Sequence, residues 1–232
     1  MLTIWCVYIG NKYPVEYVHN LYWMVQKNSN FAFTFKCITD QIIPIFDQKR
    51  RDFCKIESVP ALQFDVPSDK LWFHKLSLFH YANGPSIYFD LDTIICGNLS
   101  PLLFYLKEIL AMPKNWAQSG HGGWQSSCMI WNGELRKPFD LWEPSVAKRL
   151  HGDQCFITEV MSDQVTAINP NLILSYKYHV NRPRLKRPPK DAIAITFHGQ
   201  PDYHEVGDQW VTECLSTPTQ PWSNKRATAA IS

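Results

Sequence analysis

Ile87-Tyr88-Phe89-Asp90-Leu91-Asp92-Thr93-Ile94-Ile95 is the stretch of sequence that decides the fold. Apolar, β-branched and aromatic residues dominate it, and Gly84-Pro85 and Gly97-Asn98 flank it, so the pattern predicts a buried strand over residues 87–95. Because side chains alternate along a strand, we expect Asp90 and Asp92 on the same side. Two such carboxylates repel each other unless a divalent cation or a proton lies between them. The stretch therefore predicts chemistry at the end of a buried strand.

The composition is typical of one globular domain. The chain has 232 residues, of which 45% are apolar and 14% aromatic, and this is enough for a single core. A net charge of +2 argues against a nucleic-acid partner, and no apolar run has the length of a membrane span. Residues 1–10 lack the basic start of a signal peptide and predict a first strand. Seven scattered cysteines without a CxxC pair favour reduced thiols and a cytoplasmic protein.

Strands and helices are expected to alternate along the chain. The predicted strands cover residues 3–9, 31–39, 87–95, 127–131 and 193–197. The predicted helices cover residues 14–27, 69–82 (capped by Ser68), 100–110 and 153–162, while residues 41–66 are expected to be mostly loop. This alternation predicts an α/β fold with a mostly parallel sheet, in one domain over residues 1–221 with a flexible tail over 222–232. Ligands bind at the carboxyl ends of such strands, where Asp40, Asp90, Asp92 and His198 fall.

Lys75 lies beside the apolar side of its predicted helix. Its neighbours three and four residues away are all apolar: Leu71, Trp72, Leu78 and Phe79. A lysine in this position either extends its ammonium group to water or meets an anion, and the pattern leaves both open.

Four further features each allow a structural and a functional interpretation. The glycine-rich loop 121–127 is either a turn or a wrap around a polar ligand. Asp153 is either a helix N-cap or a carboxylate in a cleft. His198, followed by Gly199, is either structural or a third metal ligand. The basic segment 176–190 is either a solvated loop or a cover over a diphosphate or an acidic acceptor.

These residues, taken in order, resemble the glycogenin-like retaining glycosyltransferases of GT-A fold. The resemblance spans most of the chain and is carried by Val7-Tyr8-Ile9-Gly10-Asn11-Lys12-Tyr13, His74-Lys75-Leu76, Tyr88-Phe89-Asp90-Leu91-Asp92-Thr93, Gln125-Ser126-Ser127-Cys128-Met129-Ile130, Gly152-Asp153-Gln154 and Phe197-His198-Gly199-Gln200-Pro201. It implies a single GT-A, Rossmann-like domain with a mostly parallel central sheet flanked by helices.

The resemblance also implies a reaction and its residues. The reaction would move a sugar from a nucleotide-sugar donor, most simply a UDP-sugar, to a saccharide or other hydroxyl acceptor, with retention. Mn²⁺ or Mg²⁺ would be held by Asp90, Asp92 and His198, and Asp153, Gln154 and Lys75 would be catalytic. The implied donor contacts are Tyr8, Gly10, Tyr13, Asp40, Lys75, Asp90, Leu91, Asp92, Ser126, Ser127, Gly199 and Gln200.

Two departures from the family pattern stand out. The family's closing motif has two residues between its histidine and glycine and then Lys-Pro-Trp, whereas here Gly199 follows His198 directly and Asp202-Tyr203 occupies the later place. That lysine assists the departing phosphate in the family, so here its task would pass to Lys190 or to another residue of the basic segment, or would be reduced. Ser126 stands where the family has asparagine, so the sugar is left open.

Two alternatives remain at this point. A haloacid-dehalogenase-like phosphatase also carries an Asp-x-Asp motif, with Asp90 as nucleophile and Val206-Gly207-Asp208 as its late acidic motif. Its motif normally lies on the first strand, however, and has Thr or Val where Ile94 stands here. A non-catalytic binder of sugar nucleotides is the other alternative, because a fold does not fix a function.

Overall fold

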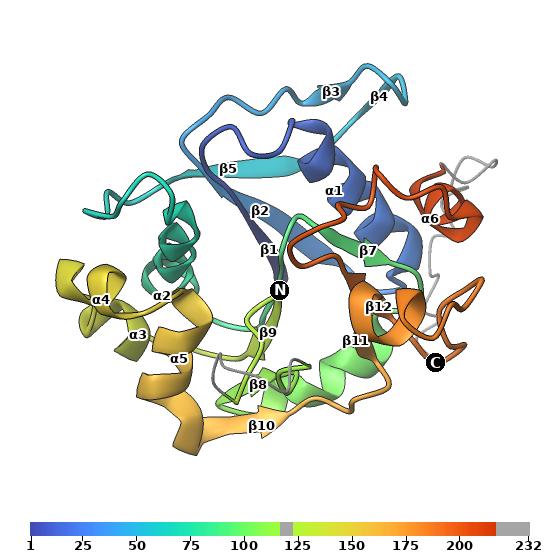
Figure 1. Ribbon diagram of the computed structural model, residues 1–232. Helices are drawn as coiled ribbons and strands as arrows, with labels where there is room; N and C mark the ends of the chain where they lie inside the picture. The colour runs from blue at the N-terminus through green and yellow to red at the C-terminus, as the bar shows by residue number, and fades with distance from the viewer. Residues whose placement is uncertain (117–122, 217–232) are drawn as a thin grey trace, which may run out of the picture.

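A seven-stranded sheet forms the centre of the molecule (Figure 1). The computed structural model describes residues 1–116 and 123–216. In spatial order the strands are β10 (Val165–Ala167), β8 (Leu110–Met112), β9 (Cys128–Trp131), β6 (Ser86–Phe89), β1 (Leu2–Tyr8), β2 (Phe33–Thr39) and β5 (Ile56–Pro60). β1 runs parallel to β2 and β6, β2 to β5, and β10 to β8, whereas β9 is antiparallel to both of its neighbours. The predicted mostly parallel α/β sheet is confirmed.

Helices cover both faces of this sheet (Figure 1). α1 (Glu16–Asn28) and α6 (Gln209–Leu215) pack together on one side, beside β7 (Thr93–Ile95). On the other side lie α2 (Leu78–Tyr81), α3 (Lys137–Asp140), α4 (Pro144–Arg149) and α5 (Asp153–Met161). Short 3₁₀ segments are η1 (Leu71–Ser77), η2 (Ser100–Lys107) and η3 (Ser162–Gln164), and η4 (Tyr176–Asn181) is a π-helical turn.

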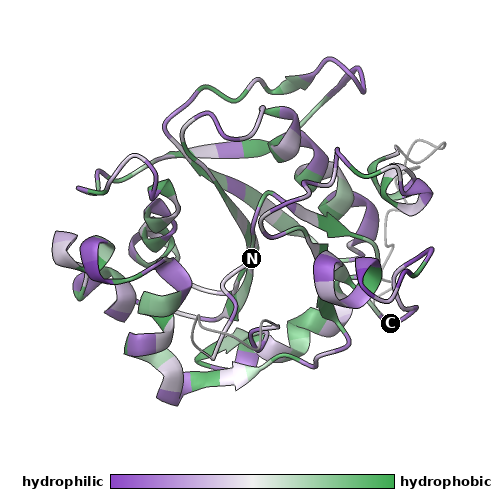
Figure 2. Cartoon of the chain, viewed as in Figure 1, coloured by the Kyte–Doolittle hydropathy of each residue, from purple (hydrophilic) through white to green (hydrophobic). Residues whose placement is uncertain are grey.

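Strand β1 contributes side chains to two hydrophobic cores, one on each face of the sheet. Ile4 and Cys6 join the apolar cluster under α1, while Trp5, on the opposite face, joins the cluster under α2, α3 and α5. A strand alternates its side chains, so a strand buried on both faces reads as a continuous apolar run. Figure 2 shows the resulting band of hydrophobic residues through the central strands.

The decisive stretch is divided between two sheets, so the prediction of one strand over 87–95 was wrong. β6 ends at Phe89, and β7 begins at Thr93 in a second sheet of order β11 (Ile173–Ser175), β12 (Ala194–Thr196) and β7. The backbone N–H of Asp90 still bonds to Ser127, but the carbonyl of Asp92 accepts from Phe197. The chain therefore switches partners between the two aspartates, and each carboxylate has its own surroundings.

The predicted helix over 69–82 is also corrected. Residues 71–77 form a 3₁₀ segment, and only 78–81 are α-helical; Ser68 does not cap it, since the residue before η1 is Lys70 and makes no side-chain cap. Within η1, Phe73 and Leu76 are fully buried and lie three positions apart. Three residues make one 3₁₀ turn, so these two side chains lie on one side of the segment.

Short strands account for the remaining differences. The predicted helix over 100–110 ends at Lys107, and β8 begins at Leu110. The segment expected to be mostly loop contains β5, an edge strand of the main sheet, and the projecting hairpin β3 (Phe46–Asp47) and β4 (Asp52–Phe53). Within the described part of the chain, no helix combines the length and apolar character needed to cross a bilayer.

Candidate active site

A cavity of about 350 Å³ lies where β1 and β6 end, between η1, α5 and the turn after β12. Ten of the residues singled out from the sequence line it: Tyr8, Tyr13, Lys75, Asp90, Leu91, Asp92, Ser126, Asp153, Gln154 and His198. They come from segments spread over almost two hundred residues, and the carboxyl ends of the parallel strands bring them together.

A buried ammonium group links two segments of the cavity wall. The Lys75 Nζ lies 3.0 Å from Asp90 Oδ1 and 3.0 Å from Asp153 Oδ2, and it is almost fully buried. Ser126 completes the group, because its hydroxyl donates to Asp153 at 2.6 Å and accepts from Lys75 at 3.1 Å. Of the two interpretations of Lys75, the structure shows the one in which it meets anions.

Helix α5 holds Asp153 in its first turn. Gly152 precedes the helix, and the Asp153 side chain makes no cap; it points instead at Lys75 and Ser126. Burial by itself lowers the pKa of Lys75, but the charges of Asp153 and Asp90 outweigh it and raise that pKa. Lys75 is therefore charged at neutral pH and compensates the two carboxylates.

Asp92 faces a different set of groups. Its Oδ2 accepts from the Tyr13 hydroxyl at 3.1 Å, and the same hydroxyl accepts from Lys12 Nζ at 2.6 Å. Its Oδ1 is buried and has no hydrogen-bond partner. Burial first, and the charge of Asp90 second, raise the pKa of Asp92 to about 7. Burying a carboxylate oxygen without a hydrogen-bond donor costs free energy, because the oxygen loses its water partners. A bound proton or cation would reduce this cost.

The aspartates fit a divalent cation better than His198 does. Hard cations prefer carboxylate oxygens, and the orphaned Asp92 oxygen is available as one. The His198 Nε2 instead lies 2.6 Å from the Ser175 hydroxyl, and its ring stacks on Trp116 and Tyr178. In the described part of the chain, no three His, Cys, Asp or Glu side chains form a ready metal-binding group. The ligand set of Asp90, Asp92 and His198 stays a prediction.

His198 is nevertheless in the protonation state that a metal ligand needs. Burial, followed by the charges of Lys177 and His179, lowers its pKa to about 4. The imidazole is therefore neutral at physiological pH, with a lone pair available on one ring nitrogen.

Tight backbone geometry marks the end of the cavity near β1. Gly10 has φ +67°, which other residues rarely adopt, and a Cβ on it would lie 2.7 Å from Leu71 Cδ1, so a side chain there would strain the backbone and displace Leu71. Its N–H donates to the Asp40 carboxylate at 3.2 Å, and its carbonyl accepts from Gln41. Gly10 and Asp40 thus support the cavity wall next to Tyr8 without lining it.

The remaining predicted residues lie just outside the cavity. Ser127 is buried beside Thr196, and Gly199, with φ +75°, follows His198 in the turn after β12 together with Gln200. In the basic segment, Lys177 Nζ lies 3.8 Å from the place of a Cβ on Gly199, whereas Lys190 lines a second cavity formed with α1 and α6. Lys177, and not Lys190, is thus the lysine beside the closing turn.

Other cavity residues were not anticipated. Trp72 is 44% exposed and lines the cavity, and its ring lies 6.4 Å from that of His151, next to Asp153 and Gln154. The expected α-helical period placed Trp72 next to the core, and only the 3₁₀ geometry turns it out. Lys12 and Gln125 also line the cavity; both belong to segments that carry the family resemblance, which implied no role for either. Residues 121 and 122 of the glycine-rich loop lie outside the described residues.

The phosphatase alternative does not match this geometry. Asp208, its proposed late acidic residue, accepts from Tyr176 and from Trp210 and is not among the described residues that line the cavity. In addition, the Asp-x-Asp stretch follows β6, whereas the phosphatase motif normally lies on the first strand, which is β1 here.

Comparison with solved structures identifies the fold. No protein-family model and no curated sequence matches the chain. The galactosyltransferase LgtC, solved with donor and acceptor sugar analogues, superposes with a TM-score of 0.66 at 12% identity, over 95% of this chain and 98% of that chain. The glycosyltransferase GlyE of Streptococcus pneumoniae gives 0.61 at 15% identity, over 94% of this chain and 61% of that one. Mouse xyloside xylosyltransferase 1 gives 0.56 at 11% identity, over 85% and 97%. The chain has the GT-A glycosyltransferase fold.

Proposed function

We propose that this chain is a metal-dependent glycosyltransferase that moves a sugar from a UDP-sugar to a hydroxyl acceptor with retention of configuration. The observation that carries the proposal is the pair of aspartates after β6. Asp90 is compensated by Lys75, while Asp92 keeps one buried oxygen without a partner. A site with one carboxylate oxygen in excess suits a divalent cation and the diphosphate bound to it.

The protein groups have separable tasks in this proposal. The metal, held by Asp90, Asp92 and His198, would neutralise charge on the departing diphosphate. Lys177, beside the Gly199 turn, would supply a second positive charge there and take the place of the lysine absent from the closing motif. Lys75 would fix Asp90 and Asp153 in position, and Asp153 with Gln154 would face the sugar.

The acceptor would enter past Trp72. This ring is 44% exposed at the cavity wall close to Gly152, and indole rings present a large flat apolar surface on which a sugar ring can pack. All seven cysteines are free, which supports a location in the reducing cytoplasm.

The test is release of nucleoside diphosphate from a panel of sugar nucleotides, with Mn²⁺ and with a chelator, in the presence of a mixture of simple sugars. We expect turnover of one donor that needs the metal and is lost in Asp92→Asn. The matched control is Asp163→Asn, an exposed aspartate after α5 that is expected to leave turnover unchanged.

Each outcome has a distinct meaning. Donor binding without turnover under all conditions would establish the non-catalytic binder instead. Turnover that survives the chelator would remove the metal from the proposal while leaving the transferase. Absence of both binding and turnover for every donor would overturn the proposal.

A further inference from the structure

The β3–β4 hairpin carries an unusual concentration of exposed apolar side chains. Among the described residues, four of the ten exposed large hydrophobic side chains fall between residues 42 and 53. They are Ile42 at 92% exposed, Ile45 at 61%, Phe46 at 38% and Phe53 at 62%. Ile42 and Ile45 lie just before the hairpin, and Phe46 and Phe53 lie on it. Single exposed apolar residues are normal on a protein surface, but four of them within twelve residues of one projecting segment indicate an interaction surface.

The two phenylalanines form one outward face. Phe46 and Phe53 are direct partners across the hairpin, and their ring centroids lie 5.1 Å apart. Asp47, the next residue along the strand, points the other way and is buried. The alternation of side chains along β3 thus places Phe46 outside and Asp47 inside.

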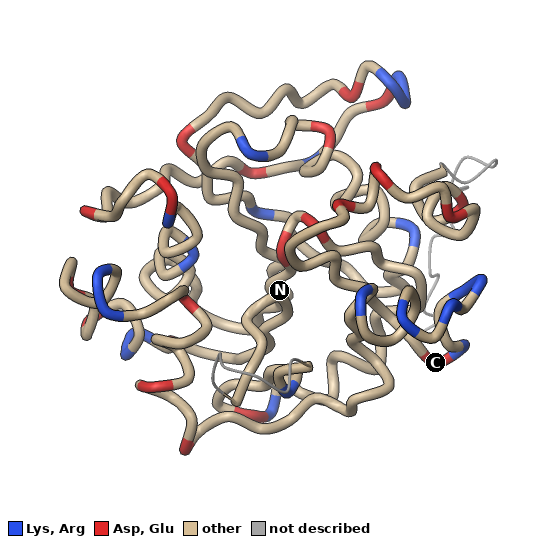
Figure 3. Tube along the Cα trace, viewed as in Figure 1, with Lys and Arg blue, Asp and Glu red and all other residues tan. Residues whose placement is uncertain are grey.

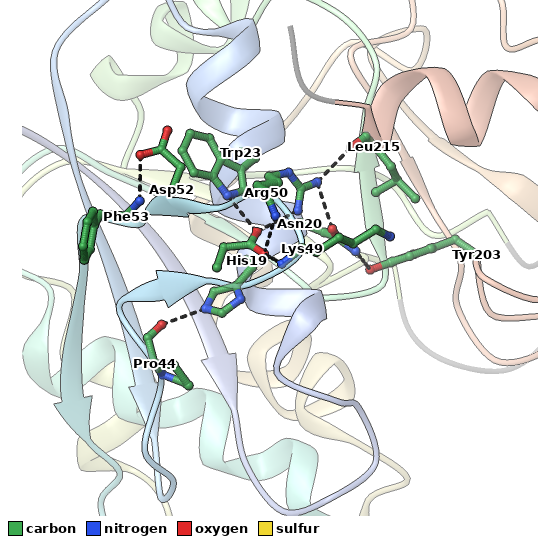
Figure 4. A network of polar contacts seen from close by, with 11 residues as sticks. His19, Asn20, Trp23, Pro44, Lys49, Arg50, Asp52, Phe53, Tyr203 and Leu215 are labelled. Atoms are coloured by element: carbon green, nitrogen blue, oxygen red, sulfur yellow. Dashed lines mark hydrogen bonds and ion pairs between the residues drawn. The ribbon is translucent and has the colours of Figure 1, made fainter. Parts of the chain in front are cut away.

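Buried polar contacts fasten the inner side to the body of the protein (Figure 4). Asp47 pairs with Arg50 at 2.9 Å and accepts from Trp23 of α1 at 3.0 Å. Arg50 also donates to the carbonyl of Leu215 at 2.8 Å, and His19 lies 2.8 Å from the carbonyl of Pro44. These contacts hold Asp47 and Arg50 against the body of the protein, while Phe46 and Phe53 stay exposed.

Exposed cations lie near the two phenylalanines along the chain. Lys49 and Arg51 are exposed in the turn between β3 and β4, and Lys55 is exposed two residues after β4. Asp52 is the one exposed acid between residues 42 and 55. Figure 3 shows the basic residues gathered at the tip, where β3 turns into β4. The Asp52 carboxylate accepts a hydrogen bond from the backbone N–H of Phe53. Exposed rings flanked by lysine and arginine suit a surface that is apolar inside and negatively charged outside.

We propose that the β3–β4 hairpin binds the surface of an anionic lipid bilayer, with Phe46 and Phe53 entering the headgroup region and Lys49 and Arg51 meeting lipid phosphates. The net positive charge of the exposed side chains favours this partner over a second copy of the chain, because two identical basic hairpins would repel each other. The hairpin is connected through residues 42–45 to Gln41, which donates to Gly10 beside the cavity wall. The binding itself does not depend on the proposed reaction.

The experiment is co-sedimentation of the full chain with vesicles of phosphatidylcholine alone or mixed with phosphatidylserine. We expect binding to the mixed vesicles only, weakened about tenfold or more in F46S/F53S and in K49Q/R51N. Asparagine is chosen at position 51 because Arg51 has φ +55° and asparagine tolerates that conformation.

A matched control comes from elsewhere on the surface. Phe104 is 64% exposed, with the Lys107 ammonium 3.7 Å from its ring centroid, so F104S/K107Q removes one exposed ring and one cation away from the hairpin. This variant is expected to bind like the wild type. Circular dichroism and thermal melting of each variant show that it is folded.

Three results would overturn the proposal. The first is the absence of vesicle binding by the wild type, and the second is equal binding by all variants. The third is a dimer in light scattering that F46S/F53S dissociates while vesicles bind nothing, which would assign the surface to a second copy. None of these results bears on release of nucleoside diphosphate in solution, so the two proposals fail separately.

Discussion

At the scale of single residues, Lys75 is the group whose removal should matter most for stability. Lys75→Met leaves the Asp90 and Asp153 carboxylates without their shared cation in a buried place. We expect a loss of about 3–5 kcal/mol in the free energy of unfolding, measured by urea denaturation with a chelator present. Lys36→Met, which breaks the exposed pair with Glu57, should cost less than about 1 kcal/mol. Equal losses in the two variants would show that the Lys75 cluster is not a buried ion pair in solution.

Asp92 should make stability depend on pH. Its pKa is raised to about 7 in the folded protein and is about 4 when unfolded, so between these values the folded state binds the additional proton. The free energy of unfolding of the metal-free protein should therefore fall as the pH rises from about 4 to about 7, and level off above. Asp92→Asn should flatten this part of the curve. A variant curve parallel to the wild-type curve would mean that Asp92 is ionised throughout.

Which residues belong to the candidate site could be predicted from the sequence more readily than which groups surround each of them. The motif letters identified Lys75, Asp90 and Asp153, but the apolar neighbours of Lys75 left its partner open, because Asp153 lies 78 positions further along the chain. The environment of Asp92 was equally hidden. Tyr13, which donates a hydrogen bond to Asp92, lies 79 positions earlier in the chain.

At the scale of elements, Gly10 is where the end of β1 meets η1. Gly10→Ala places a Cβ 2.7 Å from Leu71 in a backbone conformation that alanine rarely adopts. We expect a loss of about 1–3 kcal/mol in stability and weaker nucleotide binding, measured by denaturation and by calorimetry. Gly207→Ala is the control, since nothing lies within 4 Å of its Cβ position and its φ is not positive. Unchanged nucleotide binding in Gly10→Ala would separate this loop from the donor site.

Helices with strong periodicity and long strands were predictable; short elements were not. The spacing over 14–27 gave α1 within two residues, and the apolar run over 3–9 gave β1. Strands of three residues such as β8 and β10 are too short to show a period, and a 3₁₀ segment shares its apolar positions with an α-helix over two turns. The missed orientation of Trp72 follows directly from that ambiguity.

At the scale of the whole molecule, ligand binding should raise the free energy of unfolding. UDP with Mn²⁺ at a hundred times its dissociation constant adds about 2.7 kcal/mol to the free energy of unfolding if it binds only the folded state. We therefore expect a clear rise in melting temperature that needs both components and is lost in Asp92→Asn. A rise of the same size in a chelator would show that the nucleotide binds without metal.

The fold class was predictable as a whole because alternation of strands and helices almost dictates a parallel sheet. The strand order was not, since β12 pairs antiparallel with β7 across about one hundred residues and no local pattern records that pairing. The solved structures that share the fold have only 10–15% sequence identity with this chain, so very different sequences adopt the same backbone arrangement.

The division of the Asp-x-Asp stretch between two sheets has a consequence for biosynthesis. β6 can pair with β1 as soon as both have left the ribosome, but the Asp92 carbonyl finds its partner only when Phe197 has emerged. Translation supplies residues at about 5–20 per second, so an interval of at least several seconds separates the two events. The Asp90 N–H can bond to Ser127 well before that point, whereas the Asp92 carbonyl has no partner until the segment after β12 has left the ribosome. Chains interrupted before β12 would therefore lack the partner that holds the Asp92 backbone.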